Sequence, residues 1–155
     1  MRISRIALLA VVGALVGCGG GDGGGSGGNP AGASATGGGL TGTWRATRAE
    51  YVSASNSSLR VDTVAQGSSL TLALEASSFV LTISDPGEAA GVTNGTWRSS
   101  SDTLTLSPAG MPFSWQFDMN LSGNTLTLTG GAVEFDFNAD GAFEQARLNL
   151  TLVRQ

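Results

Sequence analysis

From residue 70 onward, apolar and polar residues alternate with a period of two in seven short segments. In a β-strand this spacing places the apolar side chains on one face and the polar side chains on the other, so each strand is buried on one side only. The 3.6-residue spacing of amphipathic helices is hard to find. The apolar positions are Leu70, Leu72 and Leu74; Phe79, Leu81 and Ile83; Leu104 and Leu106; Phe113, Trp115, Phe117, Met119 and Leu121; Leu126 and Leu128; Val133, Phe135 and Phe137; and Leu148, Leu150 and Leu152.

Turn-forming residues separate these segments. Ser122-Gly123-Asn124, Gly130-Gly131 and Asp140-Gly141 are typical of hairpin turns, and Asp85-Pro86-Gly87 and Pro108–Pro112 break the chain elsewhere. Connections this short leave no room for the helical crossovers that parallel strands need. The sequence therefore predicts an all-β domain, an antiparallel meander of about eight to ten strands. A closed up-and-down barrel and a two-sheet β-sandwich both fit this pattern, and we favour the barrel because closure removes exposed strand edges.

The first 39 residues have a different pattern. Arg2 and Arg5 precede an apolar run over residues 6–16, which is too short for a permanent transmembrane helix and suits the hydrophobic region of a signal peptide. Leu15-Val16-Gly17-Cys18 then resembles the lipobox of bacterial lipoproteins. The resemblance implies cleavage after residue 17, a diacylglyceryl group on the Cys18 sulfur and acylation of the new amino group. An ordinary secretory signal is the alternative, but a single unpaired cysteine makes little sense in an exported protein.

The lipobox resemblance also predicts the location of the protein. Several acyl chains form a stable membrane anchor, whereas one chain gives only marginal binding. The residue after Cys18 is Gly19 rather than Asp, which in the enterobacterial sorting rule implies the outer membrane. Twelve of the residues 19–39 are glycine, so this stretch is predicted to be a disordered tether. We divide the chain into a signal peptide (1–17), a lipidated cysteine with its tether (18–39) and a β domain (40–155).

Composition excludes several functions. The chain has no histidine, and from Cys18 onward it has six arginines against twelve acidic residues. A nucleic-acid partner would be repelled by this net negative charge. Without histidine, the usual general base near neutral pH and the commonest zinc ligand are both missing. We therefore expect a protein that is not an enzyme.

Short motifs in the β domain resemble lipocalins and the lipocalin-like lipoproteins of bacteria. The motifs are Gly42-Thr43-Trp44, Gly95-Thr96-Trp97 and the repeated Leu-Thr-Leu segments at residues 104–106 and 126–128. The resemblance implies an up-and-down barrel, and an arginine near the end of the chain, Arg154, that packs over Trp44. Trp44 itself is expected to plug the barrel rather than to contact a ligand.

One segment has the pattern of a calcium loop. Asp136, Asn138, Asp140 and Glu144 supply side-chain oxygens at relative positions 1, 3, 5 and 9, and Gly141 at position 6 permits the sharp bend. Arg147 stands where an EF-hand needs its bidentate acid, which excludes an EF-hand. The same residues also suit an ordinary hairpin turn, and both interpretations stay open.

Together these observations predict a lipid-anchored binding or scaffold module of the outer membrane with a lipocalin-like barrel. Its expected partners are the membrane, through the anchor, and a small apolar ligand or an envelope protein. The alternative is a domain without a pocket that acts through its surface loops. Calcium is the one cofactor that the sequence suggests.

Overall fold

A computed structural model of the 155-residue chain describes residues 39–155. The predicted signal peptide, the lipidation site Cys18 and the tether up to residue 38 lie outside the described residues. The strands are β1 (Gly42–Ser53), β2 (Arg60–Asp62), β3 (Ser69–Leu74), β4 (Ser78–Ser84), β5 (Gly91–Ser100), β6 (Thr103–Pro108), β7 (Trp115–Ser122), β8 (Thr125–Phe135) and β9 (Glu144–Arg154). The described part of the chain contains no apolar helix of membrane-spanning length.

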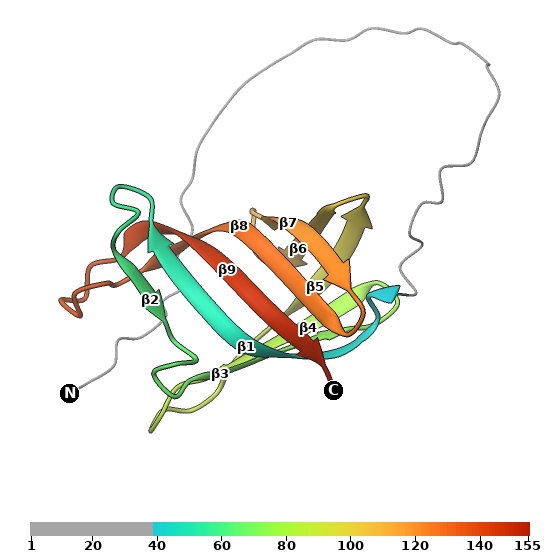
Figure 1. Cartoon of the computed structure of the whole chain (residues 1–155), viewed down its shortest axis with the longest axis horizontal. Coiled ribbons are helices and arrows are strands. Elements are labelled where there is room, and N and C mark those ends of the chain that lie inside the picture. Colours follow the sequence, from blue (N-terminus) through green and yellow to red (C-terminus); the bar gives the residue numbers. More distant parts are fainter. Residues whose placement is uncertain (1–38) are drawn as a thin grey trace, which may run out of the picture.

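The strands form a closed antiparallel barrel, as the alternation predicts. Each strand from β3 to β8 pairs with the next one along the chain, and β1 pairs with β3. The last strand, β9, closes the cylinder by pairing with β1 from Trp44 to Ser53 (Figure 1). The barrel therefore has eight strands, β1 and β3 to β9, in up-and-down order, and the β-sandwich alternative is wrong. The ninth strand, β2, pairs only with the last part of β1, where β1 and β3 have moved apart.

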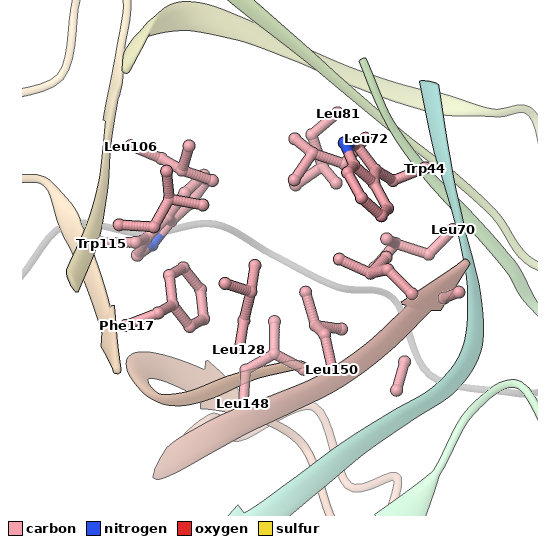
Figure 2. Close-up of a cluster of buried hydrophobic side chains, with 14 of the residues drawn as sticks. Trp44, Leu70, Leu72, Leu81, Leu106, Trp115, Phe117, Leu128, Leu148 and Leu150 are labelled. Atoms are coloured by element: carbon pink, nitrogen blue, oxygen red, sulfur yellow. The ribbon is translucent and has the colours of Figure 1, made fainter. Parts of the chain in front are cut away.

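The apolar positions of the alternating segments face the interior. The core contains 21 apolar side chains that are exposed by 8% or less, and Trp44, Leu72, Leu104, Leu126, Leu128 and Leu152 are 0% exposed. Labelled side chains from both sides of the barrel point into this interior in Figure 2. Each buried Leu or Phe contributes about 1.5–3 kcal/mol to folding by leaving water, so the inner faces of the strands supply the main driving force.

Two expected element boundaries are corrected by the structure. Gly130-Gly131 is not a hairpin turn, because β8 continues through both glycines to Phe135. The pairing between β8 and β9 shifts register between Leu128 and Gly131, which makes a β-bulge with Gly130 at a φ of 87°. The ring of Phe117 packs directly on Gly131 and occupies the space that a Cβ would need. The second correction concerns Phe113, which the alternating pattern placed in the same strand as Trp115. The strand β7 begins at Trp115, so Phe113 lies in the connection before it.

Candidate functional site

The two ends of the barrel differ in what they contain. The proximal end, where the described chain begins at Gly39, also holds the C-terminus and the turns β3–β4, β5–β6 and β7–β8. The distal end holds the connections β1–β2, β2–β3, β4–β5, β6–β7 and β8–β9. Figure 1 shows the proximal end on the right and the distal loops on the left.

Trp44 and Arg154 close the proximal end. The Trp44 indole nitrogen donates a hydrogen bond to the carbonyl of Leu40 at 2.8 Å, and Leu40 is itself buried. The Arg154 guanidinium carbon lies 4.2 Å from the centre of the Trp44 ring, a cation–π contact. The same guanidinium donates to the carbonyls of Thr41 (2.6 Å) and Gly39. The predicted packing of Arg154 over Trp44 is confirmed, and it ties the end of the chain to the start of the barrel.

The interior of the barrel is filled mainly by large side chains. Trp44 and Phe79 are fully buried, and Trp115 and Phe117 are exposed by 5% and 2%. A cavity large enough for a small ligand would leave accessible area on the side chains that line it. The inward positions of β5 include Gly95, which lies against the Phe79 ring, and the half-buried Trp97. The Trp97 indole donates to the carbonyl of Glu75 at 2.6 Å and so covers the barrel at its proximal end.

An aromatic ladder leads from the core to the distal loops. The Tyr51 ring stacks on Phe135 with 4.3 Å between ring centres, and Phe135 meets Phe137 edge to face at 4.9 Å. Tyr51 is near the end of β1 and is only 3% exposed, whereas Phe137 belongs to the β8–β9 loop and is half-buried. The ladder therefore anchors this loop to the end of the barrel.

The Tyr51 hydroxyl is unusual among the buried polar groups. No described residue forms a hydrogen bond with this hydroxyl. Within residues 39–155, every side-chain nitrogen or oxygen that solvent cannot reach does have a hydrogen-bond partner. The oxygen therefore reaches the surface at the distal end while its ring is buried. Burial and the nearby Asp85 carboxylate together raise the pKa of Tyr51 well above its usual value.

Asp85 lies where β4 ends, and it is half-buried. One of its carboxylate oxygens accepts a hydrogen bond from the Ser68 hydroxyl, whereas no residue of the described chain donates to the other oxygen. Sequence reasoning singled out neither Tyr51, near the end of β1, nor Asp85, directly after β4. The one available signal was that Tyr51 is the only tyrosine of the chain.

The four predicted calcium ligands lie in the β8–β9 loop, and the structure gives their oxygens backbone partners. Asp136 accepts hydrogen bonds from the N–H groups of Gly141 (2.9 Å) and Asp140 (3.3 Å). The Asn138 amide donates to the Asp140 carboxylate at 3.0 Å, and Asp140 also accepts from the N–H of Ala142 at 2.7 Å. Glu144 accepts from the N–H of Phe137 at 3.2 Å. These are the local hydrogen bonds of an Asx-rich turn.

Within residues 39–155, no group of three or more His, Cys, Asp and Glu side chains is arranged to hold a metal ion. Asp136, Asn138 and Asp140 are joined by hydrogen bonds, and Glu144 lies at the base of the loop. Calcium binding by this loop stays a prediction.

Charge is divided unevenly between the two ends, a feature that the order of residues along the chain conceals. The described residues contain six arginines and eleven acidic residues. The proximal half has three of each and is neutral: Arg45, Arg98 and Arg154 with Glu75, Asp102 and Asp118. The distal half has all the excess negative charge: Glu50, Asp62, Asp85, Glu88, Glu134, Asp136, Asp140 and Glu144 with Arg48, Arg60 and Arg147.

Four of the distal charged side chains hold β2 against the barrel. Glu50 is buried on the outer side of β1, and it forms ion pairs with Arg48 and, at 3.7 Å, with Arg60 of β2. The Asp62 carboxylate accepts a hydrogen bond from the N–H of Ala49 at 3.1 Å, at the place where β1 has left β3. These charges are partly neutralised within the structure, whereas Glu88 and Asp140 are exposed.

Comparisons with family models, curated proteins and solved structures found no match. The closed eight-stranded antiparallel barrel is compatible with a lipocalin-like barrel.

Proposed function

We propose that this protein is a lipid-anchored interaction module of the bacterial cell envelope, without enzymatic activity, that contacts a partner through the distal end of its barrel. The observation that carries the proposal is the arrangement of the barrel. The chain enters at Gly39, which Arg154 holds at the proximal end, and the loops gather at the opposite end (Figure 1).

This arrangement suits a protein that is tethered on one side. An anchor at Cys18 followed by the glycine-rich stretch would bring the membrane to the proximal end, where Trp44 and Arg154 are already engaged. The distal loops would then face away from the membrane. An excess of negative charge at that end supports the same orientation, because it is repelled by an anionic membrane surface.

The packing of the interior favours this interaction module over a barrel that holds a small apolar ligand. Ligand pockets of small-molecule binders measure roughly 300–1,000 Å³. Trp44, Trp115, Phe79 and Phe117 are exposed by no more than 5%. Ligand binding inside the barrel would therefore require several of these side chains to move.

Within this proposal, the protein is a lipocalin-like lipoprotein of the outer membrane. The contact between Arg154 and Trp44 supports the likeness to lipocalins, and the lipobox pattern at residues 15–18 supports the anchor. The missing histidine supports a role without catalysis.

Site-specific photo-crosslinking in intact cells tests the function. A photoreactive amino acid at Leu59 or Glu88, both exposed at the distal end, is expected to give a discrete protein adduct. The same amino acid at Ser101, in the proximal β5–β6 turn, is the matched control and is expected to give none. Adducts only from Ser101, or extraction of a stoichiometric apolar molecule from the purified protein, would contradict the proposal.

The anchor is tested separately with Cys18→Ala. This variant is expected to remain an unprocessed precursor or to leave the membrane fraction, because the sulfur that carries the lipid is missing. Normal processing and membrane sedimentation of the variant would refute the lipobox interpretation.

A further inference from the structure

We propose that two copies of this chain associate through the free edge of β8, as an antiparallel pair of strands related by a two-fold axis at Val133. This association does not depend on the interaction function proposed above. Two independent observations support it: backbone groups of β8 that have no partner, and charged side chains that come together in this one pairing.

The pairing between β7 and β8 does not extend over the whole length of β8. It ends at Thr129, because the bulge at Gly130 turns β8 out of register, and from Gly131 to Phe135 the strand pairs only with β9. Figure 1 shows β9 between β8 and β1, and β1 has left β3 in this part of the wall. The distal part of the wall is therefore a four-stranded sheet, β8–β9–β1–β2, with β8 and β2 as its edges.

Two residues of β8 direct their backbone groups towards the free edge. The Gln145 carbonyl of β9 accepts a hydrogen bond from the N–H of Ala54 at 2.9 Å, so the backbone groups of Gln145 face β1. Glu134 lies opposite Gln145 and therefore directs its own N–H and C=O away from β9, as does Ala132 two residues earlier. Within residues 39–155 these backbone groups have no hydrogen-bond partner. A strand edge of this kind is a template for another extended chain.

The two edges of this sheet differ in how well they are protected. The strand β2 has only three residues and includes Arg60 and Asp62, and short charged edges resist pairing. The free stretch of β8 from Gly131 to Phe135 has no proline and one charged side chain, Glu134. We therefore expect a further strand to add at β8.

A second copy of β8 fits this edge without bringing like charges together. In antiparallel pairing about Val133, Ala132 of each copy lies opposite Glu134 of the other copy, and the two residues exchange N–H···O=C bonds. The two Glu134 side chains are then not directly opposite each other, an arrangement that would destabilise the pair.

The same register supplies a partner for Arg147. This residue of β9 lies beside Ala132; it is exposed and forms no ion pair within residues 39–155. In the proposed pair, Arg147 and Glu134 of the second copy lie on either side of the small Ala132 side chain, with about 10 Å, or two strand spacings, between their Cα atoms. Both side chains are long enough to meet over Ala132. This charge complementarity favours a second copy over another extended chain as the occupant of the edge.

The interface is small, so we expect the association to be weak in dilute solution and to depend on the membrane. Two chains anchored through Cys18 on one membrane surface would have a high local concentration. The predicted tether, with a reach of roughly 25 Å, allows the two antiparallel barrels to share that surface.

Disulfide trapping of the full-length protein in intact membranes tests the inference. Val133 lies on the two-fold axis, so Val133→Cys is expected to form a disulfide with the same residue of a second copy on mild oxidation. Val61→Cys, at a half-buried valine of the β2 edge, is the matched control and is expected to give less than about one fifth of that dimer yield. The parent protein under the same oxidation corrects for any disulfide that involves Cys18.

Ala132→Pro tests whether the trapped dimer uses the backbone of this edge. Proline removes an N–H that points away from β9, so the monomer is expected to keep its melting temperature, while the Val133→Cys dimer yield falls about fivefold or more. If Ala132→Pro does not fold, Glu134→Arg takes its place. It brings two positive charges together across the interface and is expected to lower the yield about threefold, and adding Arg147→Glu is expected to restore it.

Equal dimer yields from Val133→Cys and Val61→Cys would show random collision and overturn the inference, and a higher yield from Val61→Cys would place the contact at β2 instead. A Val133→Cys dimer that persists in folded Ala132→Pro, or that ignores the charge reversal where that variant does not fold, would overturn pairing through β8. None of these results alters the distal photo-crosslinks, which test the interaction function separately.

Discussion

At the proximal end of the barrel, the Arg154 guanidinium packs on the Trp44 ring and the two side chains close the core. The proximal half has as many arginines as acidic residues. At the distal end, the Tyr51 hydroxyl has no partner among the described residues, and the loops have an excess of negative charge. The two ends therefore differ: contacts within the chain close the proximal end, whereas the distal end has exposed charged side chains.

The largest effect expected from this comparison is the loss of Trp44. Trp44→Ala removes a fully buried aromatic side chain and leaves the Leu40 carbonyl without its donor, so it should lower the free energy of unfolding by about 3–5 kcal/mol. Urea unfolding followed by circular dichroism measures this loss. Asp140→Ala in the exposed distal loop is the control and should cost about 1 kcal/mol or less. Equal costs would mean that the two ends contribute equally to folding.

Arg154 should have the next largest effect. Arg154→Ala removes the cation–π contact and two hydrogen bonds to carbonyls, and we expect a loss of about 1–3 kcal/mol in the same urea experiment. Arg98→Ala is the matched control, because Arg98 is exposed and forms no ion pair within residues 39–155. Arg154→Lys should restore less than half of the loss, since lysine lacks the planar guanidinium. If Arg154→Ala lowers the free energy of unfolding no more than Arg98→Ala does, Arg154 does not stabilise the closed end of the barrel.

Much of the fold could be predicted from the sequence because a strand that is buried on one side has an obligatory period of two. Leu72, Phe117 and Leu150 occupy inward positions for that reason, and the short connections leave only antiparallel pairing. Gly130-Gly131 was misread because glycines suit both a hairpin turn and a bulge. Only the register against β9 and the ring of Phe117 distinguish the two.

The distal end could not be predicted, because its properties depend on residues that are far apart in the chain. Tyr51 lies on β1 and Asp85 follows β4, and no local pattern in the sequence links them. The strand β2 was also missed, since three residues give no periodicity and its position depends on Asp62 reaching the backbone of Ala49. The calcium pattern was visible in the sequence, but its oxygens are also acceptors for the loop's own N–H groups.

Calcium should sharpen the comparison by stabilising the distal end alone. If Asp136, Asn138, Asp140 and Glu144 converge on one ion, calcium must compete with their present hydrogen bonds, and an affinity of about 0.1–1 mM is expected. At ten times the dissociation constant the gain is about 1.4 kcal/mol, or several degrees in melting temperature for a domain of this size. Sodium at equal ionic strength should have no such effect, and Asp140→Ala should abolish it. An unchanged melting temperature at about 10 mM calcium would reject the calcium site and keep the interpretation of this segment as an ordinary hairpin turn.

The smallest expected effect is the alkaline titration of Tyr51, which reports on the distal end without altering it. The folded-state pKa of Tyr51 is raised, first by burial and then by Asp85, above the value near 10 of an unfolded chain. The resulting stability is complete below that unfolded value and is lost as the pH rises through the folded one. Between pH 9 and about 10.5, the free energy of unfolding should fall by about 0.8 kcal/mol from this group. Tyr51→Phe should remove this part of the pH dependence. Because Tyr51 is the only tyrosine, the ultraviolet absorbance of tyrosinate follows its ionisation directly. A titration midpoint near 10 in the folded protein would contradict the raised pKa and would show that the hydroxyl is freely solvated.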